Sequence, residues 1–180
     1  SCDETAISLI EVKNSGKKSQ FKILGNEVSS QIDLHTQYGG VFPMMAKREH
    51  GKNILLVLEK VLKEAKMYSV NKKAQPNLSL EKKVNKLLDR ENEIQDRWLG
   101  VMPFIKKPKI DVIAVTTGPG LEPALWVGIS FAKALSTYWN IPIVKVNHME
   151  GHLLAPLLKK TEAGTAVAHD AFPAIGLLVS

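Results

Sequence analysis

Residues 110–147 read IDVIAVTTGPGLEPALWVGISFAKALSTYWNIPIVKVN, and this stretch decides the fold. Ile110–Thr116 is a near-continuous apolar run, which is typical of a strand buried on both faces of a parallel sheet. A turn leads into a helix whose small residues permit close packing, and Ile141–Asn147 is a second apolar strand. A strand, a helix and another strand in this order predict a parallel crossover, and therefore an α/β fold.

The sequence upstream predicts a β-hairpin followed by an amphipathic helix. Thr5–Val12 and Phe21–Gln31 are rich in β-forming residues, and the segment between them is polar and contains glycine, which is typical of a hairpin. Residues 39–43 (GGVFP) mark a loop. From about Glu49 to Lys66, apolar residues recur on one helical face and charged residues on the other, which indicates a helix packed on a core.

The sequence after residue 147 predicts a helix, a linker and a last strand. HMEGHLLAPLLKK (148–160) begins the helix, Thr161–Asp170 is polar and contains glycine, and AFPAIGLLVS (171–180) is apolar. The first strand of the chain has no upstream neighbour, and the last strand ends without the turn that should follow it. We therefore expect both ends of the chain to be cuts in a longer protein.

A basic segment interrupts an otherwise nearly neutral chain. The net charge is +6, and ten basic residues between residues 71 and 109 oppose five acidic ones, which leaves a local charge of +5. Periodic apolar residues from Ser79 to Leu99 predict one amphipathic helix, and we interpret Met67–Lys109 as an insertion that contains it. Its charge suits a contact with a polyanion such as RNA. The alternative is a solvated, lysine-rich surface segment.

Composition places the chain among globular proteins of about one domain. It has 180 residues, of which 44% are hydrophobic. No apolar run approaches the roughly 18 residues that a membrane span needs, so no membrane partner is expected. The single cysteine, Cys2, excludes an internal disulfide bond and fits a reducing compartment.

Two turns carry residues that are suited to binding. TTGPGLEP (116–123) joins a strand to a helix, and its glycines free the backbone so that amides at the helix start can face an anion. It lacks the spacing and the Lys-Ser/Thr pair of a P-loop, and a purely structural turn is the alternative. SCDET (1–5) precedes a hairpin strand, and Asp3 either faces a phosphate or cation or satisfies local amides.

His148 and His152 are four positions apart in HMEGH, which places both imidazoles on one helical face, near enough to bind one metal ion. The pattern resembles that of the zincin proteases, but their glutamate directly follows the first histidine, whereas Glu150 lies two residues after His148. A helical step of about 100° per residue turns Glu150 away from the position of a zincin base. The alternative is two histidines that merely share a helical turn, since two ligands supply only half of a tetrahedral site.

Five segments in order resemble the family of tRNA N6-adenosine threonylcarbamoyltransferases, formerly labelled glycoproteases or O-sialoglycoprotein endopeptidases. The segments are SCDETAISL, SSQIDLHTQYGGVFPMMAKREH, IDVIAVTTGPGLEPALWVGISFAKAL, VNHMEGHLLAPLL and FPAIGLLVS. The resemblance runs from Ser1 to Ser180 and is interrupted only by Met67–Lys109, which is longer than usual in the family. Five ordered motifs make chance similarity a poor explanation.

The resemblance implies an α/β fold of the actin/sugar-kinase/Hsp70 type, in which each of two lobes is built on an RNase H-like sheet. Residues 1–165 would then form most of the first lobe, with a basic helical insertion at about residues 67–109. Residues 166–180 would be a linker and the first strand of the second lobe. The family's first strand and nearly all of its second lobe would be missing, so the lobe would be incomplete at both ends.

The resemblance also implies a reaction. The threonylcarbamoyl group passes from threonylcarbamoyl-AMP to N6 of adenosine 37 in tRNAs that read codons beginning with A, and AMP leaves. His148 and His152 match the family's metal-binding histidines, with one divalent metal ion, Fe²⁺ or Zn²⁺, per subunit. The third ligand, an aspartate of the second lobe, has no counterpart in this chain. Such a metal acts as a Lewis acid on the threonylcarbamoyl group.

Further residues and partners follow from the same resemblance. Leu178, Val179 and Ser180 match the start of the family's substrate-binding loop. Asp3 and Glu4 match acidic residues at the nucleotide cleft and are the candidates for a catalytic role. A bacterial member would be cytoplasmic and would act with a dimerising paralogue and a small ATPase, whereas some eukaryotic members are mitochondrial. The basic insertion becomes a candidate contact for tRNA or for a partner protein.

Two rival functions are compatible with the sequence. One is a metal-dependent protease or glycoprotease, although Glu150 is misplaced and no GxSxG motif is present. The other is a non-catalytic scaffold paralogue of the transferase, although such relatives usually lose the metal-binding histidines. We also expect the 180-residue chain by itself to be inactive and poorly stable, because its cleft has only one wall.

Overall fold

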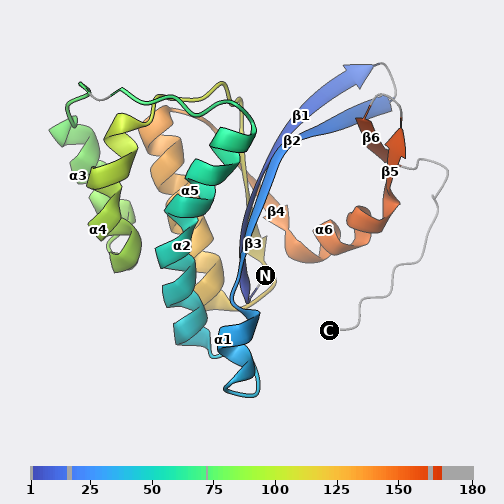
Figure 1. The fold of residues 1–180 in the computed structure, drawn as a ribbon, viewed down its shortest axis with the longest axis horizontal. Coiled ribbons are helices and arrows are strands. Elements are labelled where there is room, and N and C mark those ends of the chain that lie inside the picture. Colours follow the sequence, from blue (N-terminus) through green and yellow to red (C-terminus); the bar gives the residue numbers. More distant parts are fainter. Residues whose placement is uncertain (1, 16–17, 72, 162–163, 168–180) are drawn as a thin grey trace.

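The fold is built from helices that pack on two small β-sheets (Figure 1). The computed structural model describes residues 2–15, 18–71, 73–161 and 164–167. Within these ranges, four strands form a sheet in the order β1-β2-β6-β5, and β3 and β4 form a second sheet. The mixed α/β class expected from the sequence is confirmed. No helix in the described ranges is both long enough and apolar enough to cross a bilayer.

The predicted hairpin is confirmed and is longer than expected. β1 (Glu4–Ser15) pairs antiparallel with β2 (Lys18–Ser30), with a register shift at Leu9/Ile10. Helix α2 (Pro43–Glu64) crosses this hairpin at Gly25, where an added Cβ would lie 2.9 Å from the carbonyl oxygen of Val61. Glycine at this point therefore sets how closely the helix approaches the sheet.

The helix expected from about residue 49 begins six residues earlier. Short helix α1 (Ile32–Thr36) and a turn at Gly39 and Gly40, with φ of 70° and 157°, precede it. Pro43 then occupies the first turn of α2 and does not break the helix. Proline is tolerated there because the N–H that it lacks would have no partner inside the helix.

The parallel crossover is confirmed by the pairing of its strands. β3 (Ile113–Gly118) lies parallel to β4 (Ile143–Asn147), with Ile113 opposite Ile143, and α5 (Glu122–Trp139) connects them. The expectation that the first of these strands is buried on both faces is wrong for the described chain. Most of β3 is only partly buried, because α5 is the main element packed against it, and Val144 of β4 is 51% exposed.

The insertion contains two helices, so the prediction of one helix from Ser79 to Leu99 is wrong. α3 (Leu78–Leu87) and α4 (Asn92–Val101) are followed by a 3₁₀ turn, η1 (Met102–Phe104). Asn77 is the N-cap of α3, since its Oδ1 accepts from the N–H groups of Ser79 and Leu80. Between the two helices, the buried carboxylate of Glu91 lies 3.4 Å from the Lys47 ammonium of α2. This tertiary contact stabilises the non-helical turn that separates α3 from α4.

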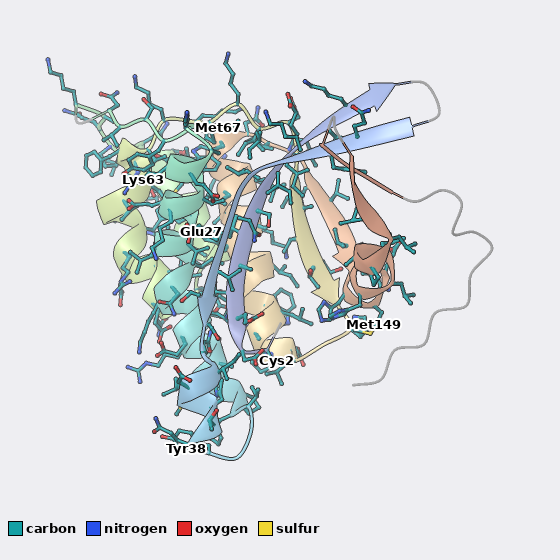
Figure 2. The ribbon with its side chains drawn as sticks, turned by 45° about the vertical axis from the view of Figure 1, so that its right-hand side comes forward. Cys2, Glu27, Tyr38, Lys63, Met67 and Met149 are labelled. Atoms are coloured by element: carbon teal, nitrogen blue, oxygen red, sulfur yellow. The ribbon has the colours of Figure 1, made fainter. Side chains whose placement is uncertain are left out.

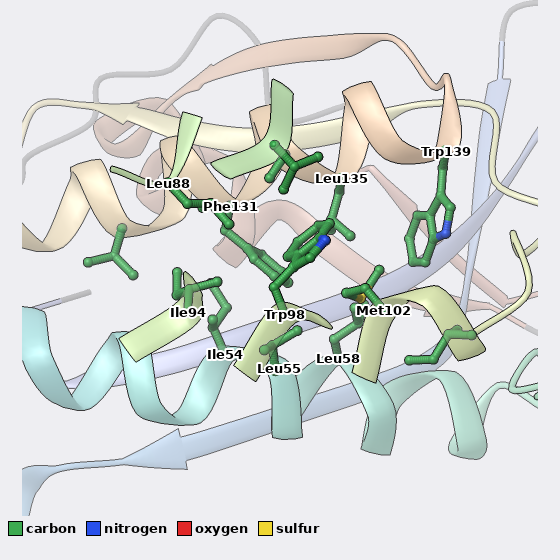
Figure 3. Close-up of a cluster of buried hydrophobic side chains, with 14 of the residues drawn as sticks. Ile54, Leu55, Leu58, Leu88, Ile94, Trp98, Met102, Phe131, Leu135 and Trp139 are labelled. Carbon is green, nitrogen blue, oxygen red and sulfur yellow. The ribbon is translucent and has the colours of Figure 1, made fainter. Parts of the chain in front are cut away.

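The apolar face of the insertion supplies a large part of the hydrophobic core (Figure 3). The side chain of Trp98 is fully buried, and its ring lies edge-on to Phe131 and Tyr138 of α5, with centroid separations of 6.2 and 5.6 Å. Ile54, Leu55 and Leu58 of α2 belong to the same cluster. The expectation of a solvated surface segment therefore applies only to the outer face of these helices.

The chain after β4 forms short elements. α6 (His148–Leu154) and η2 (Ala155–Leu157) lead into β5 (Leu158–Thr161), which pairs with β6 (Gly164–Val167). β6 falls inside the segment predicted as a polar linker, and it pairs with β2 through Gln20↔Ala166 and Phe21↔Thr165. That part of the linker prediction is wrong. The strand predicted at residues 171–180 lies outside the described residues.

If the insertion is part of the core, removing one of its buried rings should destabilise the fold as a whole. We expect Trp98→Ala to lower the free energy of unfolding by about 3–5 kcal/mol, the range for loss of a buried aromatic side chain. Chemical denaturation of the intact protein measures this value. The matched control is Leu99→Ala, because Leu99 is 46% exposed and should cost less than about 1 kcal/mol. Equal losses in the two variants would contradict this role.

Candidate functional site

The two histidines of HMEGH lie side by side at the start of α6. Their Nε2 atoms are 3.1 Å apart, and the ring centroids are 4.4 Å apart with an angle of 67° between the planes. His148 is partly buried and His152 is exposed. The spacing of four positions therefore brings the imidazoles together as the sequence predicts.

The separation of the two nitrogen atoms fits a shared metal ion. Two histidine nitrogens at about 2.0–2.1 Å from one ion lie about 2.8–3.4 Å apart when the angle between them is about 90–110°. The observed 3.1 Å falls inside this range. Burial lowers the pKa of His148 from its ordinary value, which favours the neutral imidazole that binds metals. Within the described residues, no third histidine, cysteine or carboxylate completes a ligand set around the pair.

Asn147 fixes the first turn on which the histidines stand. Its side-chain Oδ1 accepts hydrogen bonds from the N–H groups of Met149 and Glu150, at 2.9 and 3.3 Å. Such an N-cap satisfies backbone donors that the helix cannot satisfy itself. Because Asn147 is also the last residue of β4, the helix follows the strand without an intervening loop.

The acidic residues of SCDET lie at the start of β1. Asp3 precedes the strand, and its carbonyl accepts from the N–H of Gln31 at 2.7 Å, while Glu4 is the first strand residue. Figure 2 places Cys2 and Met149 toward the same end of the strands of the two sheets. The start of β1 and the first turn of α6 therefore lie toward the same end of the two sheets.

The remaining predicted positions are the turn TTGPG and the three residues Leu178, Val179 and Ser180. TTGPG is a strand-to-helix turn, with φ of 147° at Gly118 and 153° at Gly120, and the conformations of these glycines explain the motif. An added Cβ at Gly120 would lie 3.5 Å from the Leu125 side chain. Leu178, Val179 and Ser180 lie outside the described residues.

A buried polar cluster behind SCDET was not predicted from the sequence. Its members are Thr5, Gln31, His35 and His50, each no more than 6% exposed. The Oγ1 of Thr5 lies 2.7 Å from the Nδ1 of His50, and the Nε2 of Gln31 lies 3.2 Å from the same atom. The signal that could have found it is the position of His50, four residues before Ile54 on the buried face of α2.

The hydrogen bonds of this cluster favour a neutral ring at His50. The amide nitrogen of Gln31 can only donate, so the Nδ1 of His50 accepts, and the proton of His50 resides on Nε2. The Oε1 of Gln31 can only accept, so His35 donates through Nε2 at 3.2 Å. Burial is the main cause that lowers the pKa of His50 from 6.5, in agreement with a neutral ring. The cluster ties the start of β1 and the end of β2 to α1 and α2.

The sequence model of the family described as tRNA N6-adenosine threonylcarbamoyltransferase matches residues 22–71 and 104–180. The chain belongs to this family. The model leaves residues 1–21 and 72–103 unmatched, and the second of these ranges includes both helices of the insertion. The resemblance to the family is confirmed, and the match is interrupted inside the segment that was interpreted as an insertion.

Curated members of the family match the chain along its whole length. A tRNA N6-adenosine threonylcarbamoyltransferase from Fusobacterium nucleatum subsp. nucleatum is 39% identical over 181 residues, which cover all of this chain and 37% of the relative. A relative with the same name from Anaeromyxobacter sp. (strain Fw109-5) is 36% identical over 180 residues, which cover all of this chain and 38% of the relative. The chain thus spans little more than a third of the length of these relatives.

The cap of the histidine helix can be tested by substitution. Asn147→Ala should lower the free energy of unfolding by about 1 kcal/mol, because it removes the acceptor of two backbone N–H groups. Asn147→Asp keeps an acceptor at the same place and should retain most of the stability. Denaturation curves of the two variants measure the difference, and equal curves would contradict the capping role.

The polar cluster predicts a specific pH dependence. Where the folded pKa of His50 lies below 6.5, the unfolded chain binds more protons, so stability is full above about pH 6.5 and falls as the pH drops below it. His50→Asn keeps an acceptor near the position of Nδ1 and cannot titrate. Between about pH 7.5 and pH 5.5, the wild-type protein should therefore lose more unfolding free energy than this variant. Parallel pH curves would contradict the assignment of a neutral, buried His50.

Proposed function

We propose that the protein of which this chain is part transfers the threonylcarbamoyl group from threonylcarbamoyl-AMP to N6 of adenosine 37 in tRNA. The observation that carries the proposal is the pair of histidine Nε2 atoms 3.1 Å apart, in a chain that belongs to the transferase family. The two matched relatives bear the name of this activity.

His148 and His152 would hold one divalent metal ion, Fe²⁺ or Zn²⁺, together with a carboxylate from outside the described residues. Two histidines and one carboxylate leave coordination positions open for a substrate. When bound, such an ion supplies a Lewis acid that stabilises negative charge on the carbonyl oxygen of an acyl group.

The residues of this chain prepare that site. The Asn147 cap holds the turn that aims both imidazoles at one point. Burial lowers the pKa of His148, which favours the neutral ring that a metal ion requires. Asp3 and Glu4 are proposed to contact the nucleotide or the attacking amine. The start of β1, where they stand, lies toward the same end of the sheets as α6, which supports this role.

The architecture that suits this function is an RNase H-like lobe of the actin/sugar-kinase/Hsp70 type. The antiparallel hairpin of β1 and β2, followed by the parallel pair of β3 and β4 with helices on one side, supports this assignment. Residues 1–165 would form this lobe and residues 166–180 would lead into a second one. The missing ligand and the substrate-binding loop, which begins at Leu178, Val179 and Ser180, would complete the cleft.

Cellular context follows from the relatives. Both matched relatives are from bacteria. We therefore propose a cytoplasmic enzyme that acts on tRNA with a dimerising paralogue and a small ATPase.

The metal role is tested by replacing both histidines in the intact protein. His148→Ala with His152→Ala should abolish stoichiometric metal binding and should reduce tRNA threonylcarbamoylation at least about 100-fold, because loss of metal ligands removes the Lewis acid. Metal content by elemental analysis and product formation on a tRNA transcript measure the two effects.

Glu150→Gln is the matched control because it changes an exposed residue of the same helix. It should retain metal and tRNA modification. If Glu150→Gln abolished a chelator-sensitive proteolytic activity, a protease function would replace this proposal. Modification of tRNA by the double-alanine variant at the wild-type rate would also overturn the proposal.

A further inference from the structure

The fold buries part of the negative charge of the insertion and leaves its positive charge exposed. Every basic residue that the structure describes between residues 71 and 109 is exposed. α3 and the turn after it carry a row of them, Lys82, Lys83, Lys86 and Arg90, which we call the α3 basic surface. Within the described residues, none of these four makes an ion pair with a carboxylate.

Three of the five acids in the same segment do not oppose this surface. Glu81 is 4% exposed, so its carboxyl lies inside the fold and not on the outer surface, and burial raises its pKa. Glu91 is 2% exposed and faces Lys47 of α2, and Glu93 lies 3.5 Å from Arg48 of α2. Of the acids, Asp89 and Asp96 remain exposed. The outer surface is therefore more positive than the sequence balance of the segment indicates.

We propose that the α3 basic surface binds the phosphate backbone of tRNA. This inference rests on the proposed function, because it takes tRNA to be the substrate. Closely spaced lysines on one helical face suit the regular charge of a nucleic-acid backbone. A protein partner is less well matched, since protein interfaces are depleted in lysine and centred on aromatic and apolar side chains. Leu78, at the first position of α3, is the one strongly exposed apolar residue of this helix.

The position of this surface determines what it can affect. α3 lies at the opposite end of the molecule from α6 (Figure 1), and the side chains at that end extend outward from the ribbon (Figure 2). The surface therefore contacts a part of the tRNA away from the modified adenosine. Its loss should weaken tRNA binding and raise KM, with little effect on the chemical step.

The test neutralises the row without disturbing the core. In the intact protein, Lys82→Gln, Lys83→Gln and Lys86→Gln are combined, because all three side chains are exposed. The matched control combines Lys22→Gln, Lys60→Gln and Lys66→Gln, which removes the same charge from exposed positions on β2, on α2 and just after α2. The probe is an unmodified transcript of a tRNA that reads codons beginning with A, titrated at several salt concentrations.

If three phosphate contacts are lost, the slope of log K against log salt should decrease by about 2 to 3, and affinity at physiological salt should fall about 10- to 100-fold. The control triple variant should change both quantities much less. Equal losses in the two triple variants, or unchanged binding in the α3 variant, would overturn the inference.

Binding and turnover are read separately, so the two proposals can fail independently. If the wild-type protein modifies tRNA but the α3 variant binds tRNA normally, the inference that the α3 basic surface binds tRNA is wrong, and the proposed transferase function stands. If tRNA binding depends on the α3 lysines but the wild-type protein does not threonylcarbamoylate tRNA, the inference about the α3 basic surface stands and the proposed function is wrong.

Discussion

The close packing of α2 is the constraint on which the rest of the structure depends. On one side this helix approaches β2 at Gly25, and on another its own Gly51 leaves room for Glu93 of α4, whose Cβ would lie 3.1 Å from an added Cβ. α5 packs against the same helix. Two glycines, one on the strand and one on the helix, thus let hairpin, helix and insertion share one core. Larger residues at either point would separate layers whose burial provides most of the stability.

The insertion combines two roles that are usually assigned to different segments. Its inner face places Trp98, Leu88 and Ile94 in the core, whereas its outer face concentrates positive charge. The ion pairs that dock it, Glu91 with Lys47 and Glu93 with Arg48, also remove negative charge from the outer face. The docking of the insertion on α2 and the loss of negative charge from its outer face are therefore consequences of the same contacts.

Patterns within single segments predicted the fold well, and contacts between segments account for the errors. The crossover and the histidine pair depend on local periodicity, and both were predicted. The division of the inserted helix depends on the contact of Glu91 with Lys47, and the pairing of β6 depends on β2, which is more than a hundred residues away. The polar cluster joins Thr5, Gln31 and His50 from three elements, and each of them alone is an ordinary polar residue.

The direct junction of β4 with α6 has a mechanical consequence. Asn147 ends the strand and caps the helix, so no spare residue lies between the sheet and His148. A hinge needs a few linking positions that absorb changes in backbone angles, and this junction has none. The two imidazoles are therefore held rigidly relative to β4, and moving them with respect to this strand would require a change within the strand or the helix itself.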